Sequence, residues 1–328
     1  MIGICQFGAG RIGAIHAANI AARTDARLRA VVDVNRDAAE ALAKRHGAKV
    51  VDEAAGLTDP EIAAVVIASS TDTHARLIEA AARAGKAIFC EKPIDLDLGR
   101  VDQAVAAVIR AKVALQVGFN RRFDPSFAEL HREVRAGRVG RVEMVQITSR
   151  DPAPPPLDYV RISGGLFRDM MIHDLDMARW LLGEEPVEVF ATASSLVDPA
   201  IGKAGDVDTA VAVLRTASGA ICQIGNSRRA AYGYDQRIEV FGAKGMVRAE
   251  NRTPTTVQRY GADAIATDKP LFFFLERYAD AYRLELDHFL DCVKAGKTPS
   301  VGAEDGKRAL VLANAAAESL KTNRPVKV

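Results

Sequence analysis

Residues 2–13 read Ile-Gly-Ile-Cys-Gln-Phe-Gly-Ala-Gly-Arg-Ile-Gly, and this stretch decides the fold of the first half of the chain. A short apolar run before the glycines predicts a buried strand, and apolar side chains at helical spacing follow them. Gly8, Gly10 and Gly13 match the pattern G-x-G-x-x-G. In that pattern the first glycine permits a tight turn, the second lets the backbone approach a pyrophosphate, and the third lets the helix pack against the strand. The stretch therefore predicts a strand–turn–helix unit that binds a dinucleotide.

An acidic residue completes this fingerprint. Asp33 lies about 20 residues after the glycines, at the end of the second predicted strand. A carboxylate there accepts hydrogen bonds from the adenosine ribose and repels a 2′-phosphate, which favours NAD over NADP. Arg36 would pair with such a phosphate, so NADP stays an alternative, as does a glycine turn without a ligand. The predicted cofactor contacts of this region are Gly8, Gly10, Arg11, Ile12, Gly13, Asp33 and Arg36.

The alternation of strands and helices continues to about residue 120. Apolar runs predict further strands at 28–34, 63–68, 87–90 and 113–118, and helical spacing predicts helices at 36–46, 71–84 and 96–110. Strands rich in Val and Ile that alternate with helices are typical of parallel βαβ units. Residues 1–120 are therefore predicted to form an α/β Rossmann domain with a doubly wound parallel sheet.

The pattern changes in residues 121–328. Long strands with apolar and polar residues in alternation are predicted at 187–196, 207–216 and 220–228, with helices at 166–182, 275–295 and 303–321. Short turns between alternating strands are typical of antiparallel pairing. The second half is predicted to be an α+β domain with a large, mostly antiparallel open sheet.

Composition excludes several classes of protein. With 328 residues, 48% hydrophobic and 26% charged, the chain has the content of about two globular domains. The formal net charge of +2 indicates neither a nucleic-acid partner nor an anionic membrane surface. The four cysteines form no CxxC pair, so no metal site is predicted, and no signal peptide or membrane-spanning run is evident. We expect a cytoplasmic protein.

Residues 69–74, Ser-Ser-Thr-Asp-Thr-His, follow a predicted strand at the carboxyl end of the sheet. Doubly wound folds bind ligands at that edge. For any one of these side chains, capping of the following helix is an equally good explanation. The predicted cofactor contacts here are Ser69, Ser70, Thr71 and His74.

Glu91-Lys92-Pro93 ends another predicted strand at the same edge. The proline restricts the turn, and a lysine there would stabilise negative charge that develops on a substrate oxygen. A solvated lysine at a strand end is the alternative, but the neighbouring cofactor turn favours the functional interpretation.

The predicted helix 166–182 carries ionisable residues in an apolar segment. Asp169, His173 and Asp176 have the spacing that places side chains on one helical face. Ionisable groups in apolar surroundings need partners, and histidine is the usual general base. A core histidine or an ion pair on the helix surface is the alternative. The metal motif HExxH is absent.

Several segments together resemble one family. GAGRIG at 8–13, EKP at 91–93, GFNRRFDP at 118–125 and GGLFRDMMIHDLDMARWLLG at 164–183 are similar to the glucose-fructose oxidoreductase/inositol dehydrogenase (Gfo/Idh/MocA) family. The resemblance covers essentially the whole chain. Two more segments, at 149–156 and 227–245, are most similar to its inositol 2-dehydrogenase members.

The resemblance implies a mechanism and a site. Family members move a hydride between a carbinol carbon and a nicotinamide without a metal, and the inositol enzymes convert myo-inositol and NAD to scyllo-inosose (2-keto-myo-inositol) and NADH. By position, Lys92, Asp169 and His173 would be catalytic, with His173 as general base. The resemblance also implies a homotetramer, with residues 121–328 as the substrate-binding and oligomerisation domain. Further predicted positions are Glu91, Lys92 and Asn120 for the cofactor, and Arg122, Asp151, Tyr232 and Tyr234 for the substrate, together with the three catalytic residues.

Alternatives remain at this point. One alternative is a related dehydrogenase that acts on another cyclitol or aldose, such as scyllo-inositol or glucose. A protein of another class, a non-catalytic NAD-binding sensor, shares the same fold. For Arg122, a salt bridge to Asp124 or Glu129 competes with a substrate contact.

Overall fold

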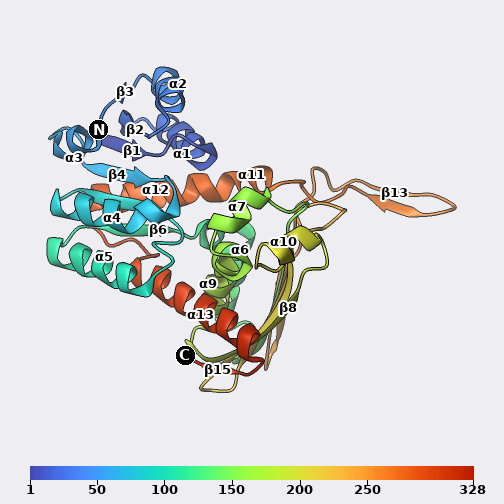
Figure 1. Cartoon of the computed structure of the whole chain (residues 1–328). Helices are drawn as coiled ribbons and strands as arrows, with labels where there is room; N and C mark the ends of the chain where they lie inside the picture. The colour runs from blue at the N-terminus through green and yellow to red at the C-terminus, as the bar shows by residue number, and fades with distance from the viewer. The chain divides into compact units, whose positions relative to one another are not determined.

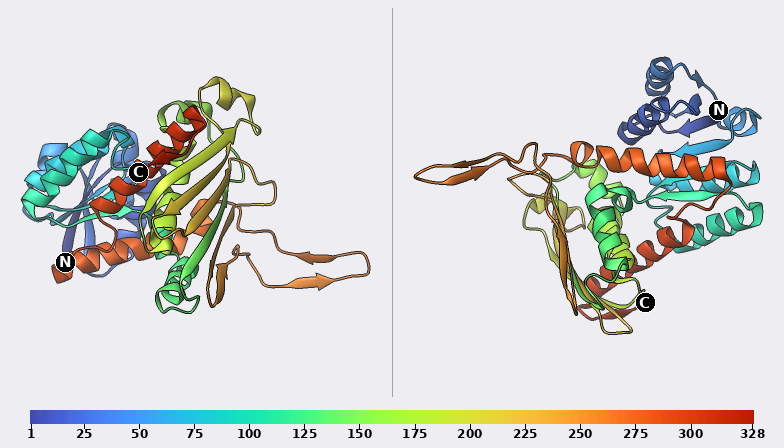
Figure 2. Two further views of the ribbon diagram at one scale, coloured as in Figure 1. Left: turned by 90° about the horizontal axis from the view of Figure 1, so that it is seen from below. Right: turned by 180° about the vertical axis from the view of Figure 1, so that it is seen from behind.

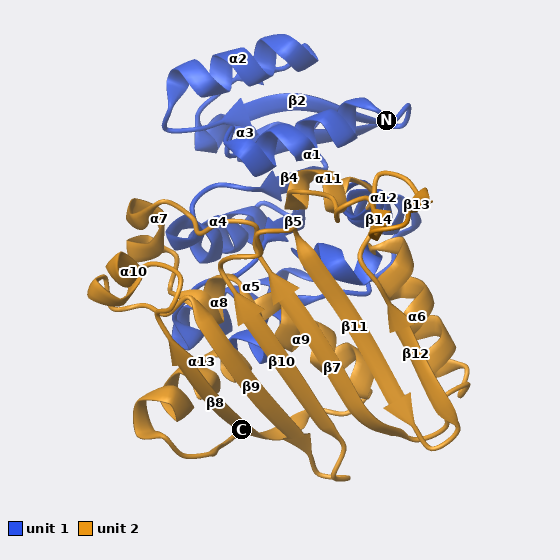
Figure 3. Ribbon diagram, turned by 90° about the vertical axis from the view of Figure 1, so that its right-hand side faces the viewer, with its two compact units in different colours: residues 1–123, 281–310 blue, residues 124–280, 311–328 orange.

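The structure is a computed structural model that describes residues 1–328, and the chain divides into two compact units (Figure 3). Unit 1 holds residues 1–123 and 281–310, and unit 2 holds residues 124–280 and 311–328. The boundary expected at residue 120 lies close to the first of these crossings. Residues 281–310 differ from the expectation, because they return to unit 1.

The return has a physical cause in helix α12 (Ala279–Ala295). Its side chains Leu286, Phe289 and Leu290 are fully buried in the core of unit 1, against Phe89 and the first strands. Removing this apolar face from water stabilises unit 1 at roughly 25 cal/mol per Å². A helix distant in the sequence is therefore part of the first core.

Unit 1 is a doubly wound α/β sheet, as predicted. Its six strands are all parallel, in the order β3-β2-β1-β4-β5-β6. All four residues of β4 are buried, which is why its sequence Ala-Val-Val-Ile shows no alternation. The strands are β1 (Ile2–Phe7), β2 (Ala26–Val32), β3 (Lys49–Val50), β4 (Ala64–Ile67), β5 (Ala87–Glu91) and β6 (Leu115–Gly118). The helices between them are α1 (Arg11–Ala21), α2 (Arg36–His46), α3 (Glu53–Thr58), α4 (Thr71–Arg83) and α5 (Leu98–Ala111), and the 3₁₀ helix η1 (Asn120–Phe123) follows β6.

Unit 2 is built on a seven-stranded sheet in the order β12-β11-β7-β10-β9-β8-β15. All pairs are antiparallel except β7 with β10, so the predicted mostly antiparallel sheet is confirmed. Strand β9 alternates buried and exposed residues because one face meets the helices of its unit and the other is open. The strands are β7 (Val142–Arg150), β8 (Pro186–Ser194), β9 (Thr209–Thr216), β10 (Ile221–Ser227), β11 (Asp235–Gly242), β12 (Gly245–Ala249) and β15 (Val326–Lys327).

A separate hairpin, β13 (Gln258–Tyr260) with β14 (Ile265–Thr267), extends from the sheet of unit 2 as an arm (Figures 1 and 2). The other helices of the chain are α6 (Pro125–Arg135), α7 (Leu157–Ile162), α8 (Leu166–Asp169), α9 (Met171–Leu182), α10 (Pro199–Lys203), α11 (Phe274–Arg277) and α13 (Ala303–Thr322). None of the helices has the length and apolar character needed to cross a membrane.

The helix expected at 166–182 is interrupted at Met170. The structure has α8 up to Asp169 and α9 from Met171, and the amide of His173 donates to the carbonyl of Met170, three residues back. A three-residue spacing tightens the turn at this point. Asp169 and His173 therefore belong to two short helices, and the expectation of one continuous helix is wrong here.

Candidate functional site

The glycine turn between β1 and α1 requires two of its glycines for steric reasons. Gly8 has φ +103°, and a Cβ there would lie 2.3 Å from the carbonyl oxygen of Ala68. A Cβ on Gly13 would lie 2.2 Å from the carbonyl oxygen of Gly8. At Gly10, by contrast, a Cβ would meet nothing within 4 Å. The turn is thus tightly packed inside and open on the side of Gly10, where a pyrophosphate would approach.

The start of α1 fits an anionic group. Gly10 precedes the helix without any side-chain cap, and the first turn contains no acidic residue. Uncapped N–H groups and the positive end of the helix dipole attract a phosphate. Arg11 and Ile12 are in this first turn.

Asp33 lies beside the turn, as predicted. Its Oδ2 accepts a hydrogen bond of 2.6 Å from the amide of Ala9, and its Oδ1 accepts one of 2.7 Å from the amide of Asn35. Each carboxylate oxygen has a second lone pair for a ribose hydroxyl. Arg36 is exposed and pairs with Glu40 on α2 at 2.8 Å.

The loop after β4 contributes hydroxyls and a buried histidine. Ser69 Oγ lies 2.7 Å from Thr73 Oγ1, and Ser70 precedes α4 without capping it through its side chain. The ring of His74 is buried, with Nδ1 donating to the carbonyl of Pro93 at 2.8 Å and Nε2 lying 3.2 Å from the carbonyl of Ser69. Burial lowers the pKa of His74. Its cofactor contact remains a prediction, and Thr71 begins α4.

The Lys92 turn follows β5 directly, at the carboxyl end of the parallel sheet. Lys92 is partly exposed, whereas Glu91 is 9% exposed and accepts a hydrogen bond from His16 Nε2 at 2.7 Å. His16 comes from α1, the helix behind the glycine turn. Unit 1 thus places the lysine and the glycine turn at one edge of one sheet.

Two further predicted residues lie at the end of β6, the last strand of this sheet. Asn120 is buried at the start of η1. Arg122 donates to Asp305 at 2.8 Å and not to Asp124 or Glu129, the two partners considered for it from the sequence. Asp124 instead pairs with Arg277.

In unit 2, Asp169 lies in an arginine cluster, defined as Asp151, Tyr159, Asp169 and Arg228. Arg228 donates to Asp169 Oδ2 at 2.9 Å and to Asp151 Oδ2 at 3.2 Å, and the Tyr159 hydroxyl donates to Asp169 Oδ1 at 2.8 Å. Burial favours the neutral guanidinium, but Asp169 and Asp151 outweigh it and raise the pKa of Arg228. Burial and the Asp169 charge raise the pKa of Tyr159 above its usual value. The cluster therefore holds an ionised Arg228 between two carboxylates.

His173 is partly exposed, one turn after Asp169. The next residue, Asp174, is fully buried and accepts a hydrogen bond of 2.9 Å from Asn226 Nδ2 on β10. This bond fixes α9 against the sheet and so sets the position of His173. Asp176 is buried, 3.7 Å from Arg179 Nη1.

The two tyrosines considered for the substrate have different surroundings. Tyr234 is buried, with its ring in an edge-to-face contact with Tyr278 at 5.9 Å. Tyr232 is 41% exposed, accepts from Arg150 at 2.9 Å and donates to Asp235.

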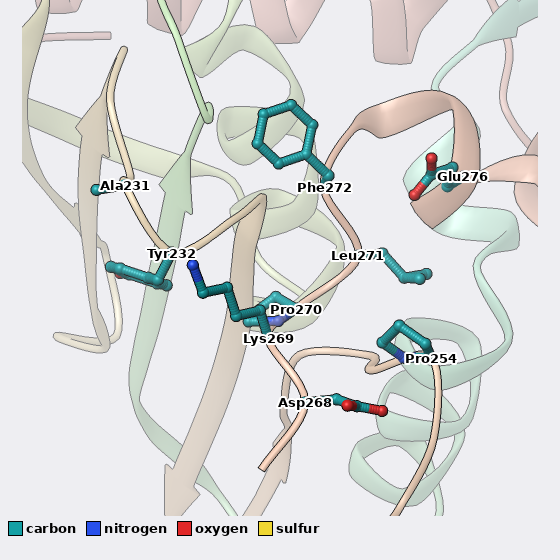
Figure 4. A pocket seen from close by; sticks show the side chains of 9 residues that line it. All are labelled: Ala231, Tyr232, Pro254, Asp268, Lys269, Pro270, Leu271, Phe272 and Glu276. Atoms are coloured by element: carbon teal, nitrogen blue, oxygen red, sulfur yellow. The ribbon is translucent and has the colours of Figure 1, made fainter. Parts of the chain in front are cut away.

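Tyr232 also lines a pocket of about 290 Å³ at the base of the arm (Figure 4). None of Asp151, Asp169 and His173 lines this pocket. Its lining residues are Ala231, Tyr232, Pro254, Asp268, Lys269, Pro270, Leu271, Phe272 and Glu276.

Sequence reasoning missed the supporting residues. Arg228 lies in the segment 227–245 that resembles the inositol 2-dehydrogenases, but neither it nor Tyr159 was singled out, and only the fold brings them to Asp169. His16 was visible as a polar residue on the apolar face of α1, a signal that could have indicated a buried partner. Glu285 lies in α12, which the sequence assigned to the second domain.

Comparison with known proteins identifies the family. Residues 2–119 match the oxidoreductase family with the NAD-binding Rossmann fold, and residues 127–248 match the GFO/IDH/MocA C-terminal domain. The chain is 51% identical over 323 residues to the myo-inositol 2-dehydrogenase of Thermotoga maritima, covering 98% of this chain and 97% of that protein. It is 52% identical over 322 residues to the inositol 2-dehydrogenase of Rhizobium meliloti, again covering 98% and 97%.

The chain is also similar to a solved structure that contains bound ligands. The scyllo-inositol dehydrogenase of Lactobacillus casei, with bound NAD(H) and scyllo-inositol, superposes with a TM-score of 0.92 at 32% identity, covering 100% of this chain and 99% of that one. Together with the glycine turn and Asp33, these matches show that the chain belongs to the Gfo/Idh/MocA family of oxidoreductases, with residues 2–119 as its NAD-binding Rossmann domain.

Proposed function

We propose that the protein is an NAD-dependent inositol 2-dehydrogenase that oxidises myo-inositol to scyllo-inosose. The two inositol 2-dehydrogenases that match it over nearly its whole length support this substrate. Bound NAD would supply the hydride acceptor. The glycine turn with the start of α1 would hold its pyrophosphate, and Asp33 its adenosine ribose.

The reaction needs a base and a group that stabilises charge on the oxygen. In this proposal His173 accepts the hydroxyl proton as the carbon is oxidised, and Lys92 donates a hydrogen bond to the same oxygen. Asp169 accepts a hydrogen bond from the substrate or from His173 and so orients them. Lys92 belongs to unit 1, and His173 and Asp169 belong to unit 2.

The arginine cluster is the observation that carries the proposal. A cyclitol offers several hydroxyls that both donate and accept, and a pocket for it needs fixed acceptors and donors. Arg228 fixes the carboxylates of Asp151 and Asp169, and the latter immediately precedes the segment that bears His173. Further contacts proposed for the remaining hydroxyls are Arg122, Tyr232 and Tyr234, with Asn120 near the nicotinamide.

A substrate panel tests the function. We expect NADH formation, followed by absorbance, with myo-inositol and NAD, and a weaker rate with NADP because of Asp33. A second candidate is scyllo-inositol, since two relatives named for it, one of them a solved structure, are 37% and 32% identical to this chain in sequence. Turnover of scyllo-inositol or glucose with inert myo-inositol would contradict the named substrate. NAD binding without turnover of any polyol would indicate a sensor.

His173→Ala tests the role of the base. Loss of a general base lowers kcat by about 10²–10⁴, while the NAD dissociation constant stays unchanged. His131→Ala, in the same unit, is the control. An unaltered kcat in His173→Ala would remove His173 from the mechanism.

We also propose a cytoplasmic homotetramer. The open face of the unit 2 sheet exposes large apolar side chains, which is unusual for a monomer and typical of an interface. These side chains are Met144, Val211, Val213, Ile221, Phe241 and Met246. Light scattering should give four times the chain mass of 35.2 kDa, and Val213→Glu should reduce it; a monomeric parent protein would contradict this assembly.

A further inference from the structure

Three ionisable side chains meet in the interior of unit 1, and we call them the dry cluster: His16, Glu91 and Glu285. They come from α1, the end of β5 and α12. The candidate ligand atoms of the three residues all lie within 4.8 Å of one another. His16 and Glu285 have no exposed surface.

The two carboxyl groups of the dry cluster have different surroundings. Burial, and then the charge of Glu91, raise the pKa of Glu285 well above its usual value. Both carboxyl oxygens of Glu285 and Nδ1 of His16 have no hydrogen-bond partner. Aromatic rings of Phe89 and Tyr282 enclose the imidazole at 4.8 and 6.0 Å. Of the two carboxyl groups, only that of Glu91, next to Lys92, is therefore hydrogen-bonded to the imidazole.

A hydrogen bond explains the geometry better than a metal ion does. His16 Nε2 and Glu91 Oε1 are 2.7 Å apart. Two ligands of one tetrahedral zinc, each about 2.0–2.2 Å from the ion, would lie roughly 3.3 Å apart. The contact has the length of a charge-assisted hydrogen bond.

A second buried histidine holds the other side of the same turn. His74 on α4 donates to the carbonyl of Pro93, one residue after Lys92. Glu91 and Lys92 are the charged groups that act on His74, and burial keeps it neutral. Lys92 is therefore flanked by two anchors, Glu91 held from α1 and Pro93 held from α4. These helices follow two of the predicted cofactor loops.

We propose that His16, Glu91 and His74 are positioning residues that couple the Lys92 turn to the cofactor-binding helices, so that a nucleotide bound at α1 fixes the lysine. The proposal rests on the proposed function for the role of Lys92 in the reaction. It concerns contacts within unit 1 only. Glu285, which has no exposed surface, contributes by closing the interior around the hydrogen bond between His16 and Glu91.

A spectroscopic experiment tests the coupling without catalysis. Lysines are reductively methylated with ¹³C, and the Lys92 signal is assigned by its loss in Lys92→Arg. ADP is the probe, because it carries the adenosine and pyrophosphate but no nicotinamide to contact Lys92. At saturating ADP we expect the Lys92 signal to shift in the parent protein and not in His16→Leu.

Matched variants separate the hydrogen bond from its surroundings. His16→Gln places an amide nitrogen near the position of Nε2, so it should restore the ADP response that His16→Leu loses. His46→Leu, on α2 in the same unit, should behave like the parent protein. An ADP response that persists in both His16→Leu and Glu91→Gln would overturn the proposal, as would a stoichiometric divalent metal in elemental analysis of the purified protein.

A double-mutant cycle gives the catalytic readout. Mutation of a residue that supports a functional group typically lowers activity by about 10–100-fold, so His16→Leu should lower kcat by that factor. If His16 acts through Lys92, His16→Leu should lower kcat no further in the Lys92→Ala background. Equal losses in both backgrounds would overturn the proposal. Full activity of Lys92→Ala alone would contradict the proposed role of Lys92, and the ADP experiment would still decide the coupling.

Discussion

The dry cluster of unit 1 and the arginine cluster of unit 2 both contain two carboxyl groups, but they control charge differently. In the dry cluster a histidine is the hydrogen-bond donor, and burial next to Glu91 raises the pKa of Glu285. In the arginine cluster the fixed charge of Arg228 lies between Asp151 and Asp169. Desolvation of a charge is costly unless an opposite charge offsets it.

The two clusters differ in their access to a substrate. The dry cluster has no room for a substrate hydroxyl, since two of its members have no exposed surface. In the arginine cluster Asp151 and Asp169 keep 22% and 11% of their side-chain surface exposed. A polyol requires hydrogen-bond acceptors that are partly exposed, as in the arginine cluster. A rigid turn requires a contact that is closed to solvent, as in the dry cluster.

Among the variants of these two clusters, the largest effect is expected from Arg228→Ala. Without the guanidinium, two partly buried carboxylates lose their shared charged donor, which destabilises unit 2 by about 3 kcal/mol, the lower end for a broken buried pair. We expect kcat/KM for myo-inositol to fall by about 10²–10³, because Asp169 loses its orientation. Steady-state kinetics and denaturant unfolding measure both quantities.

Two other variants sharpen that result. Arg228→Lys keeps the charge but not the two-pronged donor geometry, so it should recover part of the stability and little of the activity. Arg229→Ala, at the exposed neighbouring position, should be neutral in both. An active and stable Arg228→Ala would show that the arginine does not organise the cluster.

Glu285→Gln probes the protonated carboxyl of the dry cluster. The pKa of Glu285 is higher in the folded than in the unfolded chain, so the folded state binds its proton more strongly. Between the two pKa values, a rise in pH therefore lowers the free energy of unfolding of the parent protein, by up to about 1.4 kcal/mol per pH unit. Below the usual carboxyl pKa of 4.5 this contribution is constant.

The glutamine variant lacks this titration, so its stability relative to the parent should increase as the pH rises above about 4.5. Urea unfolding at several pH values measures the difference. Glu40→Gln on the exposed surface of α2 is the control and should run parallel to the parent protein. A parallel profile for Glu285→Gln would mean that Glu285 is ionised in the folded state.

The smallest effect is expected from Tyr159→Phe. The change removes the hydroxyl that donates to Asp169 Oδ1, but Arg228 still holds Oδ2. A single lost hydrogen bond beside a remaining charged donor should lower kcat/KM about threefold to tenfold. Tyr260→Phe, on the exposed arm, is the control. A loss as large as that of Arg228→Ala would make the tyrosine an equal partner in orienting Asp169.

Local patterns in the chain were sufficient for five of the six strands of the first sheet and for its glycine turn, but not for the two-residue edge strand β3. The informative signals were the glycine spacing, the apolar strands without alternation, and Asp33. Each can be interpreted with short-range steric and burial rules, because these rules act within one βαβ unit. The alternating strands of unit 2 were readable for the same reason. The family's motifs also located Lys92, Asp169 and His173 by position.

Contacts between distant segments were decided only by the tertiary structure. Whether α12 completes the first core depends on a fit between Leu286, Phe289 and the strands, which no local period encodes. The partners of a buried charge are likewise chosen by proximity in space: Arg228 reaches Asp169 across 59 residues, and His16 reaches Glu91 across 75. Periodicity records which face of an element is buried, whereas the identity of the neighbour on that face is a property of packing.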